Sequence, residues 1–149
     1  MTPLSQRLEQ AFKEALRGKQ AVALSTLRMV KTAIRHREVE VKRPLTEEEL
    51  QAVINTQVKQ RREASSEYHK AGRPDLAQKE EEELSILLSF LPPQVSEAEV
   101  EAEVSRIITE VGATGPRDLG KVMKSAMARL QGRADGKVVQ EIVRRRLGS

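Results

Sequence analysis

The stretch SFLPPQVSEAEV at residues 89–100 decides how this 149-residue chain is organised. Its Pro92-Pro93 pair cannot continue a helix and forms a stiff, extended joint. Directly after the prolines, Ser96-Glu97-Ala98-Glu99 has the Ser-x-x-Glu spacing of a capping box, which is typical of a helix N-terminus. The stretch therefore predicts two helical domains, at residues 1–92 and 93–149.

Four helices are expected before the joint, because apolar residues recur there at spacings of three and four and the helix signals are regular. The first is capped by Ser5 and ends at Gly18, and the second runs from about Gln20 to Val41 and is stopped by Pro44. The third opens with the capping box Thr46-Glu47-Glu48-Glu49 and reaches Ala71, and the fourth follows Pro74. Short connections between long helices predict an antiparallel N-terminal bundle.

Three shorter helices are expected after the joint: from the capping box to Gly112, from Pro116 to Gly132, and from Asp135 to Leu147. In the last turn, Gly132 is predicted to adopt a left-handed conformation, Asp135 to accept from the N–H groups of the next helix, and Gly136 to lie in its first turn. The predicted fold is therefore all-α, with a bundle of long helices followed by a small three-helix domain. Gly120, on the second turn of a helix, indicates close approach by another backbone, either a neighbouring helix or a nucleic-acid strand.

The composition excludes most catalytic chemistry. The chain has no cysteine, only two histidines and 2% aromatic residues. It therefore lacks a thiol nucleophile and a thiolate metal site, and His36 and His69 suggest no catalytic constellation. We expect no catalytic residue, no metal and no cofactor. No segment is apolar enough to span a membrane and the N-terminus has no signal-peptide pattern, so we expect a cytoplasmic protein without a membrane partner.

Positive charge is concentrated in two segments. Residues 17–43 carry a net charge of +6 and residues 113–149 also carry +6, whereas residues 78–110 carry −7. This pattern predicts that the protein contacts an extended polyanion at two places. An ordinary solvated helix surface would also account for the charge pattern. Because aromatic platforms for stacking single-stranded bases are lacking, the pattern favours a folded RNA or a duplex bound through its phosphates.

Four basic residues near the last turn are the first candidates for phosphate contacts. Lys121 and Lys124 lie three apart and so share one side of a helix, and Arg133 and Lys137 flank the turn. For Arg133 a phosphate contact and a surface salt bridge remain alternatives. Lys31 and Arg35 are the candidates of the other basic segment.

Two charged runs have plain structural interpretations. The run Glu80–Glu83 is expected to be solvated, with one or two of its acids paired with basic residues of the second or third helix. Arg144-Arg145-Arg146 complements the C-terminal dipole of the last helix. The same run is the wrong end of a helix for reading bases, which disfavours a helix-turn-helix DNA binder.

Five motifs, spread in order along residues 4–147, resemble the YqeY family. They are Leu24-Ser25-Thr26-Leu27-Arg28-Met29, Gly72-Arg73-Pro74-Asp75-Leu76 with Lys79-Glu80, Leu91-Pro92, Gly120-Lys121-Val122-Met123, and Gly132-Arg133-Ala134-Asp135-Gly136. The family is similar to the tail domain of GatB, a component of the tRNA-dependent amidotransferase, and to a module of some glutaminyl-tRNA synthetases.

The resemblance implies an all-helical fold in two parts and tRNA binding by the C-terminal part. It implies as partners tRNA and an amidotransferase or aminoacyl-tRNA synthetase. The tRNA-facing region of the tail maps onto the four basic residues near the last turn. The amidotransferase is a carbon–nitrogen ligase with glutamine as amido donor. Its catalytic core has no counterpart in this sequence. The alternative function is a helical protein–protein interaction module whose basic surface is incidental.

Overall fold

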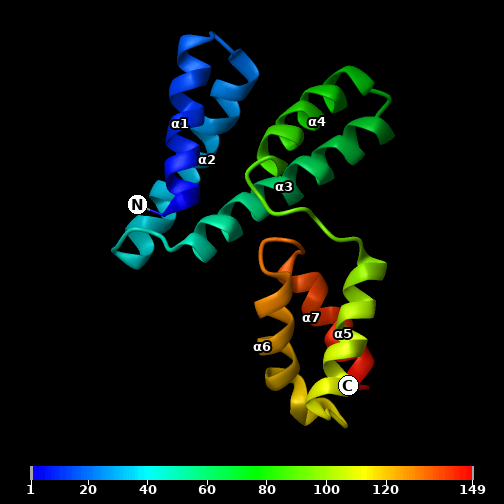
Figure 1. The fold of residues 1–149 in the computed structure, drawn as a ribbon. Helices are drawn as coiled ribbons and strands as arrows, with labels where there is room; N and C mark the ends of the chain where they lie inside the picture. Colours follow the sequence, from blue (N-terminus) through cyan, green and yellow to red (C-terminus); the bar gives the residue numbers. More distant parts are fainter. Residues whose placement is uncertain (1, 149) are drawn as a thin grey trace. The chain divides into compact units, whose positions relative to one another are not determined.

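The computed structural model describes residues 2–148, and this part of the chain is all-α, as predicted (Figure 1). Its elements are seven α-helices and one short 3-10 helix, without a strand in the described range. The chain divides into two compact units, Met1–Pro92 and Pro93–Ser149. Each unit is described by itself below.

The N-terminal unit consists of two helical hairpins. They are formed by α1 (Pro3–Arg17) with α2 (Ala21–Val41) and by α3 (Glu47–Lys70) with α4 (Pro74–Leu88). The prediction that Ser5 caps α1 is wrong by one turn. Thr2 is the N-cap, its hydroxyl accepts from the Ser5 N–H at 3.1 Å, and Pro3 occupies the first helical position, where a missing N–H does no harm.

The turn between α2 and α3 combines an unusual backbone with a predicted cap. Lys42 ends α2 in the left-handed conformation, with φ of 58°, although it carries a side chain. The capping box is confirmed: the Thr46 hydroxyl accepts from the Glu49 N–H at 3.2 Å, and Glu49 accepts in return from the Thr46 N–H at 3.0 Å. Local sequence therefore determines where α3 begins.

An ion pair lies inside the second hairpin. Arg61 of α3 and Glu83 of α4 are only 6% and 5% exposed, and Nε of Arg61 lies 2.7 Å from Oε2 of Glu83. Glu80 adds a carboxylate oxygen 3.6 Å from the same Nε, and the sulfur of Met29, on α2, lies 3.3 Å from Nη2 of Arg61. The expected pairing with the third helix is confirmed, but Glu83 is not solvated, because α4 packs this face of the acidic run against α3.

The C-terminal unit is a three-helix assembly made of α5 (Glu97–Val111), α6 (Leu119–Leu130) and α7 (Gly136–Leu147). Its core is aliphatic, and the residues buried in it include Val100, Val104, Ile107, Val122, Ala126, Val139, Ile142 and Val143. The capping box that starts α5 is confirmed. Pro116 opens a 3-10 helix (Pro116–Asp118) instead of the predicted α-helix, so α6 begins only at Leu119.

Candidate nucleic-acid interface

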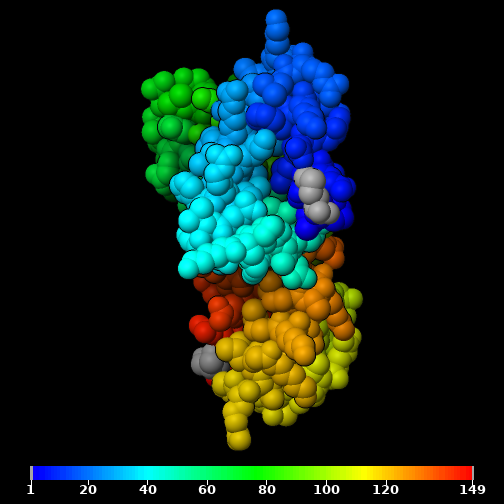
Figure 2. All heavy atoms as spheres, turned by 90° about the vertical axis from the view of Figure 1, so that its left-hand side faces the viewer, coloured from blue at the N-terminus to red at the C-terminus, as the bar shows by residue number. Residues whose placement is uncertain are grey.

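The outer side of α6 carries the two lysines that the sequence singled out. Val122, Ala126 and Leu130 follow each other at four-residue spacing and are buried in the core. Lys121 and Lys124 lie on the opposite side and are exposed. Figure 2 shows this surface in gold and orange, uncovered by the other helices of the unit. The helix therefore places its core residues inward and two cations outward.

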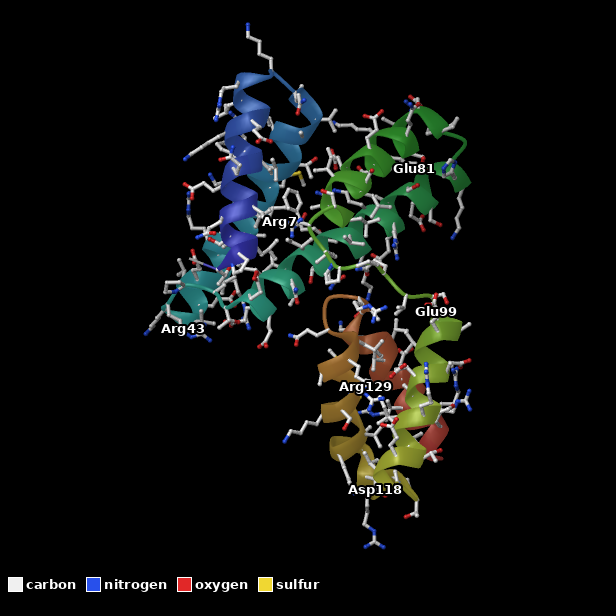
Figure 3. All side chains as sticks on the ribbon, viewed as in Figure 1. Arg7, Arg43, Glu81, Glu99, Asp118 and Arg129 are labelled. Atoms are coloured by element: carbon white, nitrogen blue, oxygen red, sulfur yellow. The ribbon has the colours of Figure 1, made fainter. Side chains whose placement is uncertain are left out.

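Arginines of the same unit neutralise the acidic side of α5. Arg129 of α6 pairs with Glu103 at 2.9 Å and also with Glu110 (Figure 3). Arg145 of α7 pairs with Glu101. Arg129 donates to both of its glutamates, and these contacts raise the pKa of the arginine.

The ion pairs separate the cations of this unit into two groups. The arginines that face α5 are occupied, whereas Lys121, Lys124 and Lys137 are exposed and form no ion pair within residues 2–148. Part of the positive charge left for a ligand therefore lies on α6 and on the start of α7. The high negative charge of residues 78–110 does not appear as an equally acidic surface, because much of it is paired.

The turn between α6 and α7 has the predicted geometry. Gly132 has φ of 75°, a left-handed value that side chains rarely adopt. The side chain of Asp135 accepts from the Lys137 N–H at 2.9 Å, and α7 starts at Gly136. A methyl group built on Gly136 would make only ordinary contact, 3.6 Å from Cε of Met127. The conformation of the turn thus depends on Gly132 and on the Asp135 cap.

Arg133 has a structural contact that the sequence did not indicate. Its Nε donates to the carbonyl oxygen of Pro93 at 3.3 Å, and its own carbonyl accepts from the Val95 N–H at 3.0 Å. Beside it, Gln94 donates to the carbonyl of Gly132 at 2.7 Å. Arg133 forms no salt bridge with the residues that the structure describes. It is half-buried and holds the start of its unit to the last turn.

Gly120 does not mark a close contact between helices. It lies in the first turn of α6, is exposed, and a Cβ built on it would meet nothing within 4 Å. The helix-packing interpretation is therefore wrong. The other interpretation, approach by a nucleic-acid strand, remains a prediction.

A further cation beside this surface was missed by the sequence reasoning. Arg117 is exposed in the 3-10 helix and precedes Lys121 by four residues, a spacing that could have indicated it. The charges of both cations act on Asp118, which is labelled in Figure 3. The N–H of Thr114 donates to Asp118 at 2.9 Å and is the main cause of its lowered pKa, and the charges of Lys121 and Arg117 contribute less.

The second pair of candidates lies on α2, in the N-terminal unit. Lys31 places its ammonium 3.9 Å from the centre of the Phe12 ring, a cation–π contact, and forms no ion pair with a described residue. Arg35 is exposed. Arg43, labelled in Figure 3, pairs with Glu49 at 2.6 Å.

Residues 2–148 contain no group of three or more side chains that could together bind a metal ion. None of the helices in this range has both the length and the hydropathy of a membrane span.

Comparison with known proteins identifies the family of this chain and several proteins to which it is similar. A family model described as Yqey-like protein matches residues 5–147. Proteins named altered inheritance of mitochondria protein 41, mitochondrial, are similar to the chain. The one from Pyrenophora tritici-repentis is 31% identical over 144 residues, 92% of this chain and 79% of that protein. The one from Lachancea thermotolerans is 30% identical over 112 residues, 73% of this chain and 60% of that protein.

A shorter stretch of higher identity is shared with a protein of Thermococcus gammatolerans. Its name describes it as a subunit of a glutamyl-tRNA(Gln) amidotransferase. It is 47% identical over 55 residues, which are 32% of this chain and 9% of that protein.

Proposed function

Because this chain belongs to the YqeY family, we propose that it is a non-catalytic tRNA-binding protein that acts with a tRNA-dependent amidotransferase or an aminoacyl-tRNA synthetase. The observation that carries the proposal is the local 47% identity to a protein whose name places it in an amidotransferase for glutamyl-tRNA(Gln). The cytoplasmic location expected from the sequence is part of the proposal. Cell fractionation tests that part.

The charge distribution of the C-terminal unit supports this function. Lys121, Lys124 and Lys137 are exposed and carry their charge outside the ion pairs of α5. Phosphate contacts from such cations supply affinity and orientation without reading sequence. The proposed interface therefore recognises the backbone and shape of a folded tRNA, with Lys31 and Arg35 as secondary contacts in the other unit.

The salt dependence of tRNA binding tests the proposal. In the variant Lys121→Gln, Lys124→Gln, Lys137→Gln, the slope of log K against log salt should become shallower by about 2–3, since each lost phosphate contact removes roughly 0.7–0.9. Fluorescence anisotropy with several deacylated tRNAs over a series of salt concentrations measures it. The variant should bind every tRNA more weakly by a similar factor, because phosphates carry no sequence information.

A matched control keeps the change of net charge the same. Lys13, Lys70 and Lys79 are three exposed lysines of the N-terminal unit outside the basic segment 17–43, and their replacement by Gln should leave the slope nearly unchanged. Arg133 is tested separately, because its contact with Pro93 makes a structural effect expected. If both triple variants weaken binding equally, the lysines of α6 and α7 do not form the interface.

Two further outcomes concern the class of function. Wild-type protein without salt-sensitive tRNA binding would favour the alternative, a helical protein-interaction module. Glutamine-dependent amidation of misacylated tRNA by the purified chain with ATP would show that it is an enzyme and would contradict the non-catalytic part.

A further inference from the structure

The N-terminal unit contains a hollow with an apolar floor. It lies between α1, α2 and the turn that leads into α3, and its volume is 680 Å³. That size falls within the roughly 300–1,000 Å³ of pockets for small molecules. Leu8 and Ile34 come from the two helices, and Leu45 and Leu50 come from the turn and the start of α3. Three separate elements therefore form a lining that no single helix provides.

Charged groups of both signs surround this floor. Lys31 and Glu38 lie on α2 at positions three before and four after Ile34, so the three residues share one face of the helix. Glu9 of α1 lines the hollow as well. The rim therefore carries two carboxylates and one ammonium group around an aliphatic surface.

These charges do not neutralise one another. In the described residues neither Glu9 nor Glu38 forms an ion pair with Lys31, whose ammonium lies over the Phe12 ring instead. Glu38 accepts one long hydrogen bond, 3.4 Å from the Leu45 N–H. Three charges thus remain available for a ligand at the edge of an apolar hollow.

The arrangement of charges discriminates between classes of ligand. A phosphate or a fatty acid would face two carboxylates with a single ammonium to hold it. A simple amine would satisfy the two carboxylates but would offer Lys31 no acceptor. A molecule with one carboxylate, one ammonium group and an aliphatic body satisfies both charge signs and covers the apolar floor.

We propose that this cavity binds a small zwitterion with an aliphatic body, an aliphatic amino acid or short aliphatic peptide, whose carboxylate contacts Lys31 and whose ammonium contacts Glu9 and Glu38. The proposal shares only Lys31 with the proposed tRNA interface, where this lysine is a secondary contact, and none of the α6 and α7 lysines takes part, so the two proposals can fail separately.

Titration of the full chain with matched small molecules tests the ligand class. The probes are L-leucine and L-leucyl-L-leucine. The comparison compounds each lack one feature: 3-methylbutylamine has no carboxylate, 4-methylpentanoate has no ammonium and glycine has no aliphatic body. Calorimetry and amide NMR shifts should show saturable binding of at least one probe, with shifts at the cavity residues, and each comparison compound should bind at least tenfold more weakly. The two probes distinguish a free amino acid from a peptide.

Variants assign the charges within the cavity. Lys31→Met keeps the aliphatic stem of the side chain and should lower the affinity for the bound probe at least tenfold. Glu9→Gln should also lower this affinity. Lys13→Met is the matched control, since Lys13 is an exposed lysine of α1 that does not line the hollow, and it should leave binding unchanged. Circular dichroism checks that each variant is folded.

Three results would overturn the proposal. The first is the absence of saturable binding by both probes up to a millimolar concentration. The second is equal binding of a comparison compound, and the third is unchanged probe affinity in folded Lys31→Met.

Discussion

The two units of the chain both set arginines against glutamates, but they do so at different depths. In the N-terminal unit, Arg61 and Glu83 meet between α3 and α4 with 6% and 5% exposure. In the C-terminal unit, the side chain of Arg129 is 42% exposed where it meets Glu103 and Glu110. A buried charge loses its hydration and needs its partner, whereas an exposed pair is screened by water and salt. Removing one partner of the first pair should therefore be costly, whereas the second pair mainly shapes the surface charge.

The largest effect is expected from breaking the buried pair. Glu83→Ala leaves the guanidinium of Arg61 buried with Glu80 as its remaining ion-pair partner and Gln57 as a neutral acceptor, and we expect a loss of about 3–5 kcal/mol in the free energy of unfolding. Urea unfolding followed by the fluorescence of Tyr68 measures it, because this chain has one tyrosine, on α3, and no tryptophan.

The double variant Arg61→Met, Glu83→Leu is the control for this effect. The short Nε contact of Arg61 is not aligned as a hydrogen bond, so apolar packing should restore most of the lost stability. A loss below about 1 kcal/mol in Glu83→Ala would show that the pair lies in a wetter environment than its exposure indicates.

A smaller, opposite pair of effects is expected at two turns with left-handed backbone. The C-terminal unit places Gly132 at φ of 75°, and the N-terminal unit places Lys42 at φ of 58°. Gly132→Ala should lower stability by about 1–2 kcal/mol, because a Cβ clashes in this conformation. Lys42→Gly relieves the same clash but adds freedom to the unfolded chain, so a net gain of about 0.5–1 kcal/mol is expected.

Each of the two turn variants has its own readout. Amide hydrogen exchange in α6 and α7 reports on Gly132→Ala, and the Tyr68 transition reports on Lys42→Gly. Unchanged exchange in the first variant, or a loss of stability in the second, would mean that the neighbouring contacts outweigh the backbone preference.

The smallest effect is an acid dependence specific to the N-terminal unit. The hydrogen bond from Arg43, aided by the Thr46 N–H, lowers the pKa of Glu49 from 4.5 to about 2. Since the folded pKa lies below the unfolded one, the contribution of Glu49 is complete above pH 4.5 and is lost as the pH falls towards 2. In Glu49→Gln the stability measured through Tyr68 should therefore fall less steeply over this interval. An identical pH profile in both proteins would contradict the assignment.

Short-range signals account for most of the helix boundaries that were predicted. The capping box of Thr46 and Glu49, the left-handed Gly132 and the cap at Asp135 each involve groups within a few residues of one another, so the sequence contains all that is needed. The start of α1 was displaced because Thr2 and Ser5 are both good caps, and the proline between them decides the choice.

The candidate interface could be predicted only in part. The sequence identified Lys121, Lys124 and Lys137 as candidate phosphate contacts. It could not show that Arg133 reaches the Pro93 carbonyl, because that contact spans 40 positions. Nor could it distinguish occupied from available cations, since the glutamates that neutralise Arg129 lie on another helix.

The sequence by itself determined the all-α class, the caps and turns, the two basic segments and the family of this protein. These follow from composition, from spacings within one or two helical turns, and from motifs read in order. Only the tertiary structure decided that Glu83 is buried, that Gly120 is open to its surroundings, and that Leu8, Ile34 and Leu45 form one cavity beside Lys31. The physical reason is that burial, ion pairing and cavity shape depend on which helices pack together, and packing joins residues that the sequence keeps far apart.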